Sequence, residues 1–447
     1  MTARHLSPRT RPLVLLCTML LLLGGCALPF GSKGPAKPAQ PVVQEQCLVL
    51  ALPASGPYAT IAAKIRRGAD QARQELSAAN ITLRLENIDT QSGDWLTKLA
   101  ALPRQCAVVG GPLQTRNYSL ARSNNTVNER AFFTFLPALA QGEEGIHAWR
   151  FFPSRQDQID ALLAFTSDTL GIDTYGVLYP TDNYGVHMTS LLEQALAARH
   201  LPLHKAAYDP AAVDAWTESA ARLVAPEEGA GNTGPIPHTP FEALFLPDSW
   251  KSMDMLTSSL LYNGEDRLVL LGTTLWEQSL SGKLVPNAHK YALAVFPGAW
   301  DASRAPKGLQ TPGHDFWTAL GYDFVQFGAA MDLQDRPSAS VVTAQAARAA
   351  HAAKALAPIS WDDAGVAHQA LYIFQVSPTG KMPLNLEQFK QSRAATLERA
   401  ALRMQGLPPA EGSLLTPGTA QAAPMPTVAP LGSTPRPSYK LRLPSQR

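Results

Sequence analysis

The chain has 447 residues, of which 45% are hydrophobic and 17% are charged, with a formal net charge of +2 at pH 7. Residues 1–25 hold three arginines and no acid, so the rest of the chain is close to neutral and has no basic stripe. This composition excludes a nucleic-acid-binding class and leaves enough length for two ordinary domains.

The N-terminus predicts export and a lipid anchor. Three arginines precede an apolar stretch, residues 13–23, which is too short to span a bilayer. Residues 23–26 read Leu-Gly-Gly-Cys and resemble a bacterial lipobox, after which residues 1–25 are removed and Cys26 is acylated. An ordinary secretory signal with an incidental cysteine is the alternative. We expect a periplasmic protein with a tether over 26–45, and Ala27 favours the outer over the inner membrane.

Besides the acylated Cys26, two cysteines remain in the mature chain. Cys47 and Cys106 are expected near the starts of two neighbouring parallel strands, so a disulfide is geometrically possible in an oxidising compartment. Two buried free thiols are the other interpretation, because cysteine is also a common small core residue.

From residue 47 onwards, short apolar runs alternate with segments of helical periodicity. The first series predicts strands at 47–52, 81–88, 106–109 and 131–135, and a helix whose apolar stripe begins at Tyr58. The second series predicts a strand at 149–152, a helix at 154–170, and further strands at 175–179, 201–207, 243–246 and 268–272 with helices between most of them. Repeated strand–helix units imply an α/β protein with mostly parallel sheets, each covered by helices on both faces.

Two other segments interrupt this alternation. Residues 225–240, rich in glycine and proline, predict a surface insertion. After a terminal helix at 386–404, residues 405–447 predict a disordered, proline-rich tail. The pentapeptide Tyr439-Lys-Leu-Arg-Leu is interpreted either as a short binding segment or as a solvated chain end.

The sequence contains none of the compact catalytic motifs that we sought. It has no Gly-x-Ser-x-Gly elbow, no phosphate-binding Gly-x-x-x-x-Gly-Lys-Ser/Thr loop and no His-Glu-x-x-His or cysteine pair at metal-ligand spacing. We therefore expect neither an enzyme, nor a metal site, nor a cofactor.

Several stretches, in order, resemble the type 1 periplasmic binding proteins of the branched-chain amino-acid receptor kind. The matching stretches are residues 48–58, 151–158, 175–185 (with Asp-Asn-Tyr-Gly at its end), 320–325 (Leu-Gly-Tyr-Asp-Phe-Val) and 359–376. The resemblance implies a two-lobed fold, with a first lobe of 46–147 plus 288–357 and a second of 148–287 plus 358–385.

A receptor of this kind closes its lobes on a small ligand, and the resemblance implies an amino-acid-like solute passed to an inner-membrane permease of an ABC transporter. Ligands of open parallel sheets bind beyond the carboxyl ends of the strands. The candidate ligand-binding residues in those loops are Ser55, Tyr58, Gln114, Thr115, Ala138, Tyr184, Asp248 and Trp250.

Family receptors hold the ligand carboxylate with hydroxyls after the third and fourth strands, and the ammonium with an acid of the second lobe. Here Leu139 and Ala140 stand where a hydroxyl is expected after the fourth strand. Each candidate also has a structural interpretation: Ser55 as a turn former, Tyr58 as core, Asp248 as a helix cap and Trp250 as packing.

The same fold serves penicillin-binding-protein activators, which contact a peptidoglycan synthase. Gly111-Pro112 and the stretch 270–276 resemble their strand ends, while the N-terminal helical-repeat domain that some activators carry is missing. The sequence favours the solute receptor and keeps the activator as the alternative.

Overall fold

The computed structural model describes residues 46–229 and 234–407. The expected signal, the lipidation site Cys26, the tether and the tail beyond 407 lie outside these residues. The strands form two main sheets and two small antiparallel pairs. None of the helices in the described ranges is long and apolar enough to cross a membrane.

The first sheet has five parallel strands in the order β2-β1-β3-β4-β5. Along β1, alternate residues enter two separate cores: Leu48, Leu50 and Leu52 pack on one face, and Cys47 and Val49 on the other. Both faces are therefore covered, as the continuous apolar strand predicts. The strand bounds are β1 Gln46–Leu52, β2 Leu83–Asp89, β3 Val108–Gly110, β4 Ala131–Thr134 and β5 Ala148–Arg150.

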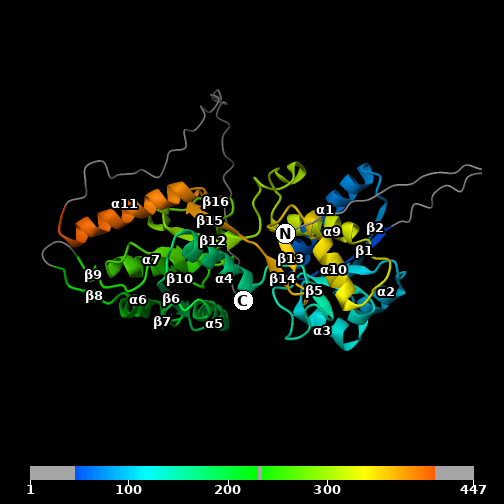
Figure 1. The fold of residues 1–447 in the computed structure, drawn as a ribbon, viewed down its shortest axis with the longest axis horizontal. Helices are drawn as coiled ribbons and strands as arrows, with labels where there is room; N and C mark the ends of the chain where they lie inside the picture. Colours follow the sequence, from blue (N-terminus) through cyan, green and yellow to red (C-terminus); the bar gives the residue numbers. More distant parts are fainter. Residues whose placement is uncertain (1–45, 230–233, 408–447) are drawn as a thin grey trace, which may run out of the picture. The chain divides into compact units, whose positions relative to one another are not determined.

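One face of this sheet is covered by α1, α9 and α10, and the other by α2 and α3. Figure 1 shows α1 beside α9. A Cβ at Gly68 would lie 1.8 Å from the Thr318 carbonyl oxygen, and one at Gly321 would lie 1.9 Å from that of Ile65. The two helices approach this closely because glycine stands at the contact on each side. The helix bounds are α1 Ala59–Ala78, α2 Trp95–Ala101, α3 Thr115–Ser123, α9 Phe316–Met331 and α10 Ala339–Ala349.

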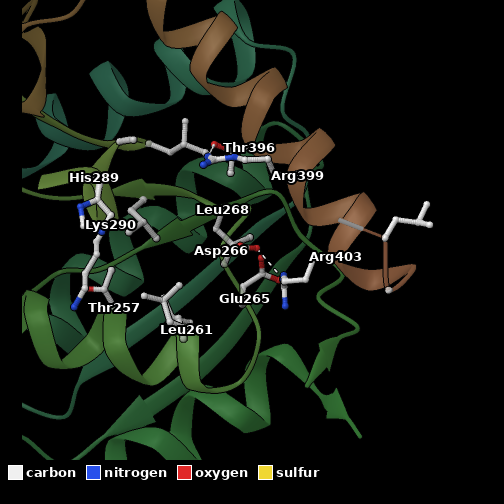
Figure 2. Close-up of a pocket in the computed structure, with 16 residues that line it drawn as sticks. Thr257, Leu261, Glu265, Asp266, Leu268, His289, Lys290, Thr396, Arg399 and Arg403 are labelled. Carbon is white, nitrogen blue, oxygen red and sulfur yellow. Dashed lines mark hydrogen bonds and ion pairs between the residues drawn. The ribbon is translucent and has the colours of Figure 1, made fainter. Parts of the chain in front are cut away.

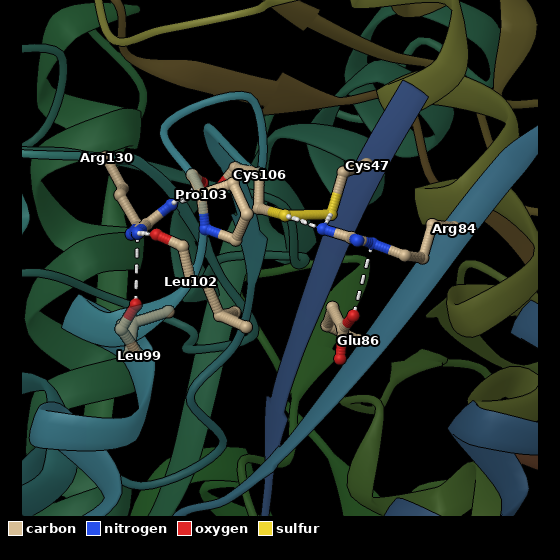
Figure 3. The surroundings of a disulfide bond; sticks show 8 residues. All are labelled: Cys47, Arg84, Glu86, Leu99, Leu102, Pro103, Cys106 and Arg130. Atoms are coloured by element: carbon tan, nitrogen blue, oxygen red, sulfur yellow. Dashed lines mark hydrogen bonds and ion pairs between the residues drawn. A yellow bond between two sulfur atoms is a disulfide. The ribbon is translucent and has the colours of Figure 1, made fainter. Parts of the chain in front are cut away.

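Cys47 and Cys106 are joined by a disulfide beside the first sheet, with Cα atoms 4.5 Å apart (Figure 3). Arg84 on the neighbouring strand β2 places its Nη2 3.2 Å from the sulfur of Cys106 and pairs with Glu86. On the other side, the buried Arg130 donates to four backbone carbonyls, those of Leu99, Leu102, Pro103 and Cys106. The chain around Cys106 is thereby fixed to the sheet.

The second sheet has seven strands in the order β16-β15-β12-β11-β10-β6-β7. The strands from β12 to β7 are parallel, whereas β15 is antiparallel to both β12 and β16. Helices α6, α7 and α8 cover one face, and α4, α5 and the start of α11 cover the other. The strand bounds are β6 Tyr175–Pro180, β7 Leu203–Tyr208, β10 Ala243–Phe245, β11 Val269–Leu271, β12 Ala294–Gly298, β15 Tyr372–Ser377 and β16 Gly380–Pro383. The helix bounds are α4 Arg155–Leu163, α5 Asn183–Ala198, α6 Trp216–Val224, α7 Met253–Tyr262, α8 Leu275–Leu280 and α11 Leu386–Met404.

The strand pairing moves two of the expected lobe boundaries. Residues 148–150 were assigned to the second lobe, but β5 pairs with β4 in the first sheet. Residues 288–298 were assigned to the first lobe, but β12 pairs with β11 and β15 in the second sheet. The sequence motifs mark family landmarks, whereas hydrogen bonding decides to which sheet a strand belongs. Below, "first lobe" and "second lobe" mean each sheet with its own helices.

Three local expectations also change. The helix expected at 154–170 is α-helical only to Leu163, and the residues Ala164–Thr169 form a π-helical turn. The closing segment at 359–376 divides into the pair β13 (Ile359–Trp361) and β14 (Ala367–Gln369), followed by β15. In the expected insertion, β8 (Pro226–Glu227) and β9 (Ile236–Pro237) pair as a short hairpin.

Candidate functional site

The carboxyl ends of the first sheet carry the candidates Ser55 and Tyr58 in the loop after β1. Ser55 is exposed, and Tyr58 stands at the N-cap of α1 with 40% of its surface exposed. Tyr58 therefore does not belong to the buried helical stripe, which begins at Ala62. The base of this loop is fixed by Asp89, whose Oδ1 accepts from the backbone N–H groups of Ala54 and Gln91.

Gln114, after β3, is bound to protein partners. Its side-chain oxygen accepts from Gln91 Nε2 at 2.9 Å and from Asn117 Nδ2 at 3.2 Å, and Arg116 in turn donates to Gln91. Preceding it, Gly111 has a φ of +101°, and a Cβ there would lie 2.4 Å from the Ala51 carbonyl oxygen. Glycine is therefore required where this loop passes β1.

Thr115 and Ala138 are brought together at a pocket of about 490 Å³ between α3 and the loop after β4. Both residues are exposed. The wall contains the Tyr118 ring, the hydroxyls of Ser119 and Ser123, and the ion pair of Arg122 Nε with Glu143 Oε1 at 3.1 Å. Leu139 and Ala140 complete the wall, so apart from Glu143 the loop after β4 presents only apolar side chains to this pocket.

At the carboxyl ends of the second sheet, Asp182 caps α5 by accepting from the Gly185 backbone N–H at 2.7 Å. Tyr184, the second residue of α5, lies under the guanidinium of Arg155, whose Cζ is 5.8 Å from the ring centroid. Burial raises the pKa of the Tyr184 phenol, and a hydrogen bond with Thr273 opposes that rise. Tyr184 is thus a partly buried hydrogen-bonding group at this edge.

Asp248, after β10, has both carboxylate oxygens engaged. Oδ2 accepts from the Tyr208 hydroxyl at 2.6 Å, and Oδ1 accepts from the Ser249 backbone N–H at 2.5 Å. Burial, followed by the interaction with Asp248, raises the pKa of the Tyr208 phenol. The Asp248 carbonyl oxygen also accepts from Trp276 Nε1 at 3.0 Å. The carboxylate therefore anchors the loop to β7.

Trp250 packs against two other aromatic residues of the second lobe. Its ring centroid lies 5.3 Å from that of Trp276 and 4.8 Å from that of Tyr291. These contacts match the structural interpretation of Trp250 as lobe packing. No group of three or more potential metal-ligating side chains occurs in 46–229 or 234–407.

The chain matches no family model and no curated protein. Among solved structures, it is similar to the C-domain of LpoA from Haemophilus influenzae, described as a regulator of PBP1A, with a TM-score of 0.51 and 16% identity over 76% of this chain and 100% of that one. A protein from Rhodospirillum rubrum, described as a branched-chain amino acid ABC transporter, gives a TM-score of 0.54 and 13% identity over 76% and 100% of the two chains. Full-length LpoA from Haemophilus influenzae gives a TM-score of 0.53 at 15% identity, and this chain spans 58% of its length.

The chain has the type 1 periplasmic binding fold. The similar structures are binding and regulatory proteins, and both kinds match this fold with nearly the same score. At this identity the likeness establishes the architecture alone. The choice between the two kinds of function must come from the chain's own residues.

Where the type 1 fold crosses from the first sheet to the second, Arg150 is a residue that the sequence interpretation missed. Its side chain is only 4% exposed, and Nη1 lies 3.0 Å from Asp157 Oδ2, while Nε lies 3.3 Å from Glu144 Oε1. Asp157 Oδ1 accepts from the Gln369 backbone N–H at 3.1 Å, and Arg150 donates to the Ala367 carbonyl. These bonds join two crossing segments. A charged residue inside the apolar run Ala-Trp-Arg-Phe-Phe was the available signal.

The motif at 320–325 has a similar fixing role within the first lobe. Asp323 is 1% exposed, and its carboxylate accepts from the backbone N–H groups of Lys354, Ala355 and Leu356, each at 2.8 Å. Burial raises the pKa of Asp323 to about 7, against the opposing effect of these three hydrogen bonds. The carboxyl group thereby fixes the segment that leads towards β13.

Proposed function

We propose that this protein is a lipid-anchored envelope regulator that binds a peptidoglycan synthase, and that it does not carry an amino acid to a transporter. The supporting observation is that the hydroxyl expected after β4 is missing and that Asp248, the expected acid of the second lobe, already accepts two hydrogen bonds. The alternative interpretation of the sequence is thus favoured over the first one.

The part of an amino-acid site that would bind the ligand carboxylate lacks some of its side-chain donors here. The loop after β4 offers Ala138, Leu139 and Ala140, none of which donates a side-chain hydrogen bond. After β3, Thr115 carries a hydroxyl, while Gln114 is held in place by the hydrogen bonds that its side-chain oxygen accepts from Gln91 and Asn117. A free carboxylate at this edge would find side-chain donors after β3 but none among residues 138–140, so one side of the family's carboxylate site is missing.

The ammonium-binding half is also engaged. Asp248 accepts from Tyr208 at 2.6 Å and from its neighbour's backbone N–H, so a ligand ammonium would have to share this carboxylate with two donors that already bind it. Trp250 is held in an aromatic cluster. Such satisfied side chains suit a lobe that serves as a rigid scaffold for a protein partner.

The location follows from the N-terminal sequence. Acylation at Cys26 would hold the protein at the membrane face, and Ala27 supports the outer membrane. A substitution of Cys26 by alanine should release the protein from the membrane fraction. Retention of this variant would contradict the anchor.

The decisive test is binding to purified bifunctional penicillin-binding proteins of the same organism. We expect the mature chain to co-purify with one of them and to raise its glycan polymerisation or cross-linking rate. A variant Gly321→Ala, in which the α1–α9 contact is disrupted, serves as a destabilised control. Neither binding nor a change in rate with any synthase would contradict the proposal.

A small-molecule receptor remains the second candidate because of the 490 Å³ pocket beside α3, which offers the hydroxyls of Thr115, Ser119 and Ser123. Thermal-shift screening against amino acids, short peptides and muropeptides tests it. A ligand at 100 times its Kd adds about 2.7 kcal/mol of stability. Thr115→Val should weaken such binding, whereas Thr60→Val, at an exposed position of α1, should not.

A further inference from the structure

A cavity of about 930 Å³ lies at the opposite end of the second sheet from the candidate site. Its wall includes Leu268 and Leu270 at the start of β11 and Ala292 and Leu293 just before β12, so it opens at the amino ends of these strands. Helix α11 crosses above it (Figure 2). The loops in which the fold's ligands are expected lie at the carboxyl ends, so this cavity is a separate feature.

Ion pairs hold α11 at the edge of the sheet. Arg393 pairs with Glu242 at 2.5 Å, immediately before β10, and Arg403 pairs with Asp266 at 3.0 Å, before β11. Between these two attachments, the helix and the sheet enclose the cavity instead of packing tightly. Helix α11 thus covers the cavity and is held to the sheet by one ion pair on each side of it.

The inner surface is apolar and its rim is cationic. The apolar wall is formed by Leu260, Leu261, Leu268, Leu270, Ala292 and Leu293. In Figure 2, Leu261 and Leu268 lie between His289 and Lys290 on one side and Arg399 and Arg403 on the other. An apolar interior beside positive charge matches an apolar chain that carries an anionic head.

The acids of the rim are already matched by cations. Glu265 is bound by Arg267 at 2.7 Å, and Asp266 is bound by Arg403. Lys290 has an acid partner, Asp254, at 3.6 Å.

Arg399 differs from the other rim cations. Its guanidinium donates to the Ala395 carbonyl at 3.3 Å and to the Thr396 hydroxyl at 3.1 Å, both on its own helix. Among residues 46–229 and 234–407, no carboxylate forms an ion pair with it. An arginine held over leucines without a counter-charge is a ready site for a carboxylate.

We propose that this cavity binds a single-chain amphiphilic anion, a fatty-acid-like carboxylate, with its chain on the leucines and its head at Arg399. The volume falls within the usual range for ligand pockets, roughly 300–1,000 Å³. This site is independent of the synthase proposal, because it uses none of the residues on which that proposal rests.

The probe is dodecanoate, which is titrated into the full mature chain at concentrations below the critical micelle concentration of dodecanoate. Octanoate and decanoate are titrated for comparison. Affinity should rise about fourfold per added methylene. Arg399→Gln should weaken dodecanoate about tenfold or more. The matched control is Arg348→Gln, since Arg348 on α10 likewise donates to its own helix and should leave the affinity unchanged.

A second pair of variants tests the apolar wall. Leu261→Asp places a negative charge at a cavity residue that is 41% exposed, so the fold should tolerate it while dodecanoate binding is lost. Leu120→Asp, at a position of α3 that is 48% exposed, is its control and should bind normally. Equal affinities across all four variants would overturn the assignment to this cavity.

Other occupants give different outcomes, each of which overturns the proposal. Dodecyltrimethylammonium binding as tightly as dodecanoate would remove the anion requirement. Retention on phosphatidylglycerol vesicles without uptake of dodecanoate would indicate a membrane surface. Gly406 and Leu407 line the cavity, and Leu414 and Leu415 follow closely in the sequence. If only a double Leu414→Ser/Leu415→Ser variant binds dodecanoate, the chain's own C-terminal segment is the occupant.

Discussion

Replacing Cys47 and Cys106 by alanine tests the disulfide that the sequence left undecided. The bridge closes a loop of 59 residues, and the loop-entropy relation gives about 4 kcal/mol of stabilisation at 25 °C for that length. Both cysteines are almost fully buried, so the loss of two sulfur atoms adds a small packing cost in the same direction. We therefore expect the double variant to lose about 4 kcal/mol of unfolding free energy.

Urea unfolding at pH 7 measures this loss, with and without a reductant strong enough to open a buried bridge. Reduction should lower the midpoint of the wild type towards that of the double variant and should leave the variant unchanged. Thiol titration of the denatured, unreduced mature chain provides an independent count. If Cys47 and Cys106 both titrate as free thiols, or if reductant does not alter the wild-type midpoint, the reasoning is refuted.

Three further changes test the packing and the crossings. Gly321→Ala should cost about 3 kcal/mol, because the new Cβ would meet the Ile65 carbonyl, whereas Gly93→Ala, where the added Cβ has no neighbour within 4 Å, should be close to neutral in urea unfolding. Arg150→Met should cost about 3–5 kcal/mol by leaving the buried Asp157 unpaired, and a loss below 1 kcal/mol would contradict the role of that ion pair. Folding raises the pKa of Asp323 to about 7, so between pH 4 and 7 the folded chain holds a proton that the unfolded chain has released. The contribution of this proton to the free energy of unfolding is fully present below pH 4 and is lost as the pH rises through 7. Relative to Asp323→Asn, the wild type should lose about 2–3 kcal/mol between pH 5 and 8; a pH-independent difference would contradict the raised pKa.

The sequence predicted the fold well because the two sheets are buried on both faces. Strands such as Gln46–Leu52 and Tyr175–Pro180 form continuous apolar runs that the pattern detects, and helices such as Ala59–Ala78 show a clear period. Sheet membership was harder to predict. A run such as Ala148–Arg150 looks the same whichever sheet it joins, and only its hydrogen bonds to β4 place it in the first.

The sequence predicted where the candidate residues lie. It could not predict whether their side chains are free to bind a ligand. Asp248 and Gln114 do lie after the strands, at positions where a ligand-binding carboxylate or amide side chain is expected. However, the groups that occupy them come from distant parts of the chain, as with Tyr208, which lies 40 residues from Asp248. Hydrogen bonds between side chains at that separation leave no local sequence pattern. The sequence therefore overestimated how many side chains of this site are free to bind a ligand.

The charged residues that the sequence interpretation missed are buried, and they bind backbone groups of distant segments. Arg150, Asp157 and Asp323 are each almost fully buried, and each bonds to backbone groups of a segment distant in sequence. Buried charges of this kind fix geometry because breaking one leaves its partner unsatisfied. A receptor that must open and close around a solute requires crossings that change their backbone angles. Crossings tied by buried carboxylates and a guanidinium instead favour one arrangement, which is the property that a regulator needs when it presents a constant surface to an enzyme.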